Sequence, residues 1–100
     1  MIKIVMMPHG VEITGHAGAA PVGHDIVCAA VSGLAYTLRE ALNDKGLLST
    51  SVMEPGHGLL TSTDRHHPYL DMAEIGFRML AEHNPEYVNF FSCRVGRDNS

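Results

Sequence analysis

The sequence is poor in the residues that mark several common protein classes. It has two cysteines, no Cys-x-x-Cys or His-Glu-x-x-His motif, and seven lysines and arginines scattered along a chain of net charge −4. These absences argue against a disulfide framework, a zinc site of those types and a nucleic-acid-binding surface. The apolar run in residues 1–8 is too short for a signal peptide or a membrane span. We therefore expect a cytoplasmic protein with free thiols, without a metal site and without contacts to membrane or nucleic acid.

The composition is ordinary for a globular protein, with 45% hydrophobic and 18% charged residues in a chain of 100. No repeat, linker or low-complexity tract divides the chain. We therefore expect a single domain over residues 1–100, with a polar tail from about residue 95.

Alternating and helical patterns predict the order of the secondary structure. Strands are expected over residues 2–7, 11–15, 47–54, 59–63 and 87–93, and helices over 25–44 and 69–83. Pro55–Gly58 is interpreted as a hairpin turn. The order ββαββαβ predicts an α+β fold, in which two helices pack on a mostly antiparallel or mixed five-stranded sheet.

The first expected helix carries an apolar stripe between Val27 and Leu42, with residues at helical spacing. Asp25 suits its N-cap, and Gly46 suits its C-terminal end.

The second expected helix has Pro68 in its first turn. Met72 and Met79 are expected on its apolar side as core residues. Glu74 and Arg78 are expected on its polar side, at a spacing that allows an ion pair.

Cys28 is the residue whose surroundings best suit chemistry. It lies near the expected start of the first helix, where unpaired backbone N–H groups and the helix dipole favour a thiolate. It is also at the edge of the apolar stripe, where a substrate has access, and Ser32 follows one turn later on the same flank. Cysteine is more commonly a buried, inert residue. On these residues alone, Cys28 is therefore a candidate nucleophile beside the more common structural role.

Two histidines lie close to Cys28 in the sequence, His16 at the end of a strand and His24 just before the helix. A Cys–His pair is the smallest arrangement for acyl transfer, because the imidazole holds the thiolate and protonates the leaving amine. Strict alternation places His16 on the polar face of its strand. For His16 to reach Cys28, the strand must therefore end or bulge near Gly15.

Two runs of the sequence, Gly15–Ala17 and Gly23–Ser32, resemble the signature of the ribosomal-processing cysteine proteases, the Prp family. The separation of twelve residues between His16 and Cys28 is similar to that of the family. Chain length and element order are also similar, so the resemblance covers essentially the full chain.

The resemblance implies that Cys28 is the nucleophile and His16 the general base, with Asp25 and Ser32 supporting the site. It implies a substrate loop that includes Gly18, Ala20, Pro21 and Gly23. It also implies a homodimer without cofactor or metal. This enzyme would remove a short N-terminal extension from a large-subunit ribosomal protein precursor, cutting after an aromatic pair.

The loop departs from the family pattern at Ala20 and Pro21. Family loops tend to have a glycine near the first position and an acidic or aromatic residue just after it, whereas Pro21 fixes φ and stiffens the chain. A diverged or phage-associated protease that acts on another precursor therefore stays an alternative.

Two other classes of function stay open at this point. A non-catalytic module of the same fold would bind an extended peptide along a sheet edge. A redox sensor would pair Cys28 with Cys93. Cys93 is otherwise expected to pack in the core or at the sheet edge, on the same strand face as Phe91. The remaining histidines, including His57 in its hairpin turn, are expected at the surface.

Overall fold

The computed structural model describes residues 1–15 and 22–94. Within them the elements are β1 (Ile2–Met7), β2 (Gly10–Thr14), α1 (Val22–Asp44), β3 (Leu48–Glu54), β4 (His57–Ser62), α2 (Pro68–His83) and β5 (Val88–Ser92). The order confirms the predicted ββαββαβ arrangement. The remaining residues, among them the predicted substrate-loop positions Gly18, Ala20 and Pro21 and the polar tail, lie outside the described part.

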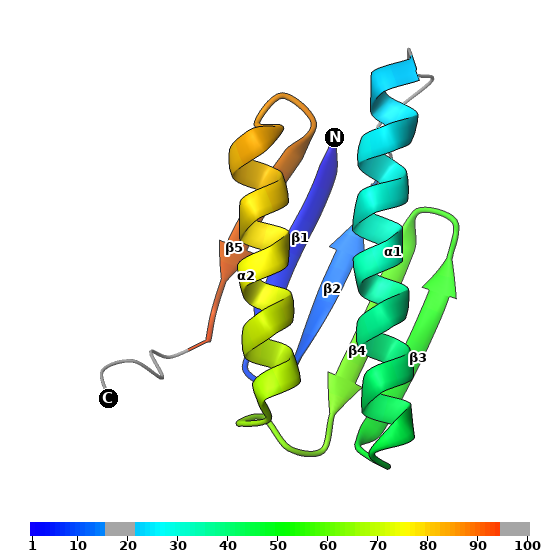
Figure 1. Cartoon of the computed structure of the whole chain (residues 1–100), viewed down its shortest axis with the longest axis vertical. Coiled ribbons are helices and arrows are strands. Elements are labelled where there is room, and N and C mark those ends of the chain that lie inside the picture. Colours follow the sequence, from blue (N-terminus) through cyan, green and yellow to red (C-terminus); the bar gives the residue numbers. More distant parts are fainter. Residues whose placement is uncertain (16–21, 95–100) are drawn as a thin grey trace.

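The strands form one five-stranded sheet in the order β3-β4-β2-β1-β5. Neighbouring strands from β3 to β1 are antiparallel, and β5 lies parallel to β1. The sheet is therefore mixed, as predicted. Both helices cover the same face of the sheet and lie side by side (Figure 1).

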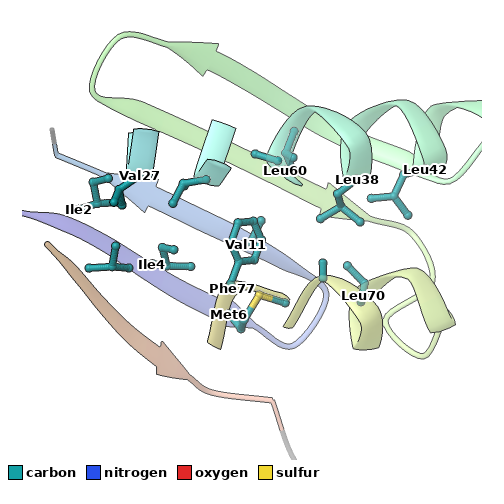
Figure 2. Packing of buried hydrophobic residues seen from close by; sticks show 14 residues of the cluster. Ile2, Ile4, Met6, Val11, Val27, Leu38, Leu42, Leu60, Leu70 and Phe77 are labelled. Carbon is teal, nitrogen blue, oxygen red and sulfur yellow. The ribbon is translucent and has the colours of Figure 1, made fainter. Parts of the chain in front are cut away.

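The hydrophobic core fills the layer between the sheet and the helices. Alternate residues of β1 are buried, as expected for a strand with one covered face. Figure 2 shows side chains from strands and helices meeting in this layer: Ile2, Ile4, Met6, Val11 and Leu60 from the sheet, and Val27, Leu38, Leu42, Leu70 and Phe77 from the helices.

Helix α1 begins at Val22, one turn earlier than predicted. Asp25 therefore lies within the helix and not at its N-cap, so the predicted cap was wrong. Cys28 is then the seventh residue of α1, beyond the four amides that lack helical partners at a helix start. The argument from orphan amides around Cys28 therefore fails.

The end of α1 agrees with the prediction. The helix stops at Asp44, and Gly46 follows with a φ of 71°. A glycine adopts this left-handed conformation without the steric cost that a side chain would bring.

Helix α2 has a different buried face from the predicted one. Met72 and Met79, expected in the core, are exposed, and Glu74, expected at the surface, is buried. Its Oε1 accepts a hydrogen bond of 2.8 Å from Nη1 of Arg94, and its Oε2 accepts one of 2.7 Å from Oγ of Ser92. A buried carboxylate needs such partners, and these come from beyond the helix, so periodicity within the helix did not predict them.

The last strand also presents its faces differently from the prediction. Phe91 and Cys93 are exposed, whereas Val88 is buried and Phe90 packs against the core. Of the two places expected for Cys93, its exposure excludes the core and leaves the sheet edge, where β5 is the outermost strand. Both cysteines are free thiols, as predicted.

Candidate functional site

An open groove of about 400 Å³ lies between the N-terminal half of α1 and the hairpin that joins β3 to β4. In Figure 1 this hairpin turns beside the upper half of α1. Residues from both of these elements and from the first two strands line the groove: Cys28, Val31, Ser32, Ala35 and Tyr36 of α1, residues 53–58 of the hairpin, and Ile2, Ile13 and Gly15.

Cys28 occupies one wall of this groove and is half-buried against the core. This position agrees with the predicted place at the edge of the apolar stripe. Ser32 lines the same groove and is exposed. A residue four positions later lies on the same helical face, so the Ser32 hydroxyl shares one wall with the Cys28 thiol.

Strand β2 ends at Thr14, and Gly15 then takes a φ of 91°. The strand thus ends near Gly15, which is the condition set above for His16 to reach Cys28. A Cβ on Gly15 would lie 2.3 Å from the carbonyl oxygen of Met1, so the position requires glycine for both its conformation and its space. His16 itself lies outside the described residues.

The amide of Gly15 donates a hydrogen bond of 3.1 Å to the carbonyl oxygen of Gly56, in the turn between β3 and β4. Gly56 has a φ of 80°, a conformation that glycine supplies in tight turns. The turn is shorter than the predicted Pro55–Gly58, because β4 already begins at His57. A backbone hydrogen bond thus connects the end of β2 directly to the far wall of the groove.

A second contact between the same two segments involves His57. Its Nε2 lies 2.9 Å from Oε2 of Glu12, and its Nδ1 lies 4.0 Å from Oε2 of Glu54. Because Thr14 is the strand partner of His57, Glu12 and His57 share a face of the sheet, the one opposite the helices. His57 is therefore half-exposed, and the contact between its ring and Glu12 connects the hairpin to β2.

The sequence analysis missed Tyr36 and Met53 as groove residues. Tyr36 follows Cys28 and Ser32 at the same spacing of four residues, which is a signal that the sequence does contain. Met53 carries no such signal, since only the return of β3 toward α1 brings it to the groove.

Residues 1–15 and 22–94 contain no group of three or more His, Cys, Asp or Glu side chains arranged to hold a metal ion. Nor do these residues include a helix that is long and apolar enough to span a membrane.

Comparison with known proteins gives a consistent result. A family model described as cysteine protease Prp matches residues 1–89. The ribosomal processing cysteine protease Prp of Mycoplasma pneumoniae is 30% identical, over 90% of this chain and 93% of that protein.

Solved structures are similar over most of the chain. SMU.848 from Streptococcus mutans has a TM-score of 0.70 at 27% identity, covering 94% of this chain and 93% of that one. The essential ribosomal processing protease Prp from S. aureus in complex with a substrate peptide has a TM-score of 0.78 at 20% identity, covering 92% and 99%. Its complex with a covalently linked product peptide has a TM-score of 0.75 at 22% identity, with the same coverage.

Proposed function

Because the chain belongs to the cysteine protease Prp family, we propose that it removes a short N-terminal extension from a large-subunit ribosomal protein precursor, cutting after an aromatic pair. The observation that carries the proposal is the position of Cys28 on the wall of an open groove. The M. pneumoniae relative is a ribosomal processing protease, and the S. aureus relative binds a substrate peptide. The whole chain acts as one protease domain in this proposal.

The lining of the groove suits an extended peptide. Ile13 and Met53, both partly buried against the core, give the lining apolar atoms. Such a lining favours aromatic side chains, because their burial removes apolar area from water.

The proposed mechanism uses Cys28 as nucleophile and His16 as its base. His16 takes the proton of the Cys28 thiol, and the sulfur attacks the carbonyl carbon of the second aromatic residue. The peptide C–N bond then breaks as His16 gives this proton to the leaving amine. His16 then takes a proton from water, which attacks the thioester and releases the acid. Since the Cys28 amide is inside α1, a donor other than this amide has to stabilise the oxyanion.

The supporting roles come from the family resemblance. Ser32 offers a hydroxyl on the same wall as Cys28. Asp25 lies in the first turn of α1, where a negative charge favours the helix start. Gly18, Ala20, Pro21 and Gly23 are proposed to contact the substrate.

A peptide that copies the precursor N-terminus, with its aromatic pair, tests this function. We expect the wild type to cleave after the pair, and we expect Cys28→Ala and His16→Ala each to lower kcat/KM by at least about 10³-fold. Cys93→Ala is the matched control, because this thiol is exposed and outside the groove, and it should cleave normally. Unchanged turnover in either dyad variant would refute the mechanism.

A second candidate substrate follows from Ala20 and Pro21, where the sequence departs from the family pattern. A protease that acts on another precursor, such as a capsid protein, would leave the ribosomal peptide intact while Cys28 still forms a thioester with other peptides. A peptide library incubated with the wild type and with Cys28→Ala separates the two substrates. If Cys28→Ala bound peptides and the wild type cleaved none, a binding module would be the better description.

We further propose that the protein is a cytoplasmic homodimer. Met72, Ile75 and Met79 are exposed apolar residues on α2, and their spacing of three and four residues puts them on one face. Sedimentation at micromolar concentration should give a dimer, and Ile75→Lys should shift it toward monomer. A monomeric wild type would contradict this proposal.

A further inference from the structure

The wall of the groove on α1 is a single row of side chains. Cys28, Ser32 and Tyr36 follow one another at intervals of four residues, and all three line the groove. Such a row runs nearly along the helix axis. With a rise of about 1.5 Å per residue, Tyr36 lies about 12 Å from Cys28 along the axis. Positions along this row therefore lie at increasing distances from the Cys28 thiol.

Tyr36 is the aromatic residue of the row, and much of its ring remains accessible, since the residue is 46% exposed. Arg39 lies 5.7 Å from the ring centroid and holds one side of it. The opposite wall contributes Met53, which is partly buried against the core. A thioether and an aromatic ring both form favourable contacts with apolar and aromatic side chains.

We propose that Tyr36 and Met53 form a distal subsite that binds an apolar or aromatic side chain of the substrate, three or four residues from the scissile bond. An extended chain advances about 3.3 Å per residue, so about 12 Å corresponds to three or four residues. The inference rests on the proposed protease function and adds to it a determinant of specificity. Tyr36 binds the substrate in this arrangement and takes no part in bond breaking.

A double-mutant cycle between enzyme and peptide tests the subsite. Each residue within five positions of the scissile bond in the ribosomal precursor peptide is replaced by alanine in turn, and kcat/KM is measured for the wild type and for Tyr36→Ala. We expect Tyr36→Ala to lower kcat/KM about three- to tenfold. One alanine peptide, three or four residues from the bond, should show the same loss with the wild type and no further loss with Tyr36→Ala.

Two further variants separate a contact from a structural effect. Tyr36→Phe keeps the ring and should restore cleavage to within about twofold of the wild type. Phe91→Ala removes an aromatic residue of similar exposure, 52%, outside the groove, and should leave the peptide profile unchanged. Binding of the peptide to Cys28→Ala, with and without Tyr36→Ala, should show the same loss of affinity.

The outcomes distinguish the two proposals. If the wild type cleaves in a Cys28-dependent manner but Tyr36→Ala affects all alanine peptides equally, the subsite is refuted and the protease function stands. Coupling only to the residues next to the scissile bond would also refute it. If the wild type does not cleave, both proposals fall.

Discussion

The amide of Gly15 and the carbonyl of Gly56 are joined by a hydrogen bond of 3.1 Å. Gly15 is the last described residue before His16, and Gly56 belongs to the hairpin that forms the far wall of the groove. The segment that leads to the proposed base is thus bonded to the wall that faces the proposed nucleophile. Changes at this junction should therefore affect both stability and cleavage.

Gly15→Ala should be strongly destabilising and should impair cleavage. The new Cβ would lie 2.3 Å from a backbone oxygen, at a φ of 91°, so the chain would have to move. Gly46→Ala is the matched control, since its φ is 71° and nothing lies within 4 Å of the new Cβ. We expect the control to lose about 1–2 kcal/mol from backbone strain alone and to retain activity. Urea denaturation measures the stability of the two variants, and peptide cleavage measures their activity. Equal losses of stability would contradict the role of the close approach between Gly15 and the Met1 carbonyl oxygen.

Arg94→Met should destabilise the protein by about 3–5 kcal/mol, because it leaves the buried carboxylate of Glu74 without its cationic partner. Arg78→Met is the matched control on the exposed surface of α2, where a substitution should change stability by no more than about 0.5 kcal/mol. Urea titrations give the free energies of unfolding of the two variants, which are compared with that of the wild type. A larger effect at Arg78 would favour the ion pair that helix spacing suggested.

Gly33→Ala should stabilise the protein by about 0.5–1 kcal/mol, since alanine favours the helix and nothing lies within 4 Å of the added Cβ. Gly76→Ala gains the same propensity, but its Cβ would meet Leu34 of the neighbouring helix at 2.7 Å. We expect Gly76→Ala to be less stable than Gly33→Ala by about 1–3 kcal/mol. Thermal or urea unfolding of the two variants measures the difference, and equal stabilities would mean that Leu34 moves aside at no cost.

Iodoacetamide should label Cys28 faster than Cys93 at pH 6. Access alone predicts the reverse order, since Cys93 is exposed and Cys28 is half-buried. An activated thiolate overrides access, because the thiolate is the reacting form. The rates are measured by mass spectrometry on Cys28→Ala and Cys93→Ala, each of which keeps one thiol. Slower labelling of Cys28 would argue against an activated nucleophile.

The succession of strands and helices followed from local patterns. Alternation in β1 and the stripe from Val27 to Leu42 each report which side of an element is apolar, and burial of apolar area drives that side toward the core. The end of α1 at Gly46 followed for a local reason as well, the left-handed conformation that glycine allows. The edge position of Cys28 came from the same stripe.

Features that depend on distant partners did not follow from those patterns. Glu74 is buried because Ser92, at the end of β5, and Arg94, just after it, give hydrogen bonds to its carboxylate. Met72 is exposed, since α2 turns its Glu74 side inward. The start of α1 was missed because the segment before Asp25 has little periodic pattern.

Taken alone, the sequence determined the ββαββαβ order and the placement of Cys28 and Ser32 on one flank of a helix, because each depends on residues near one another in the chain. Only the tertiary structure decided that Gly15, Tyr36 and the β3–β4 hairpin border the same groove as Cys28. The physical reason is that sheet pairing brings β3, β4 and β2 together beneath α1, and the register of that pairing is set by the packing of the whole core.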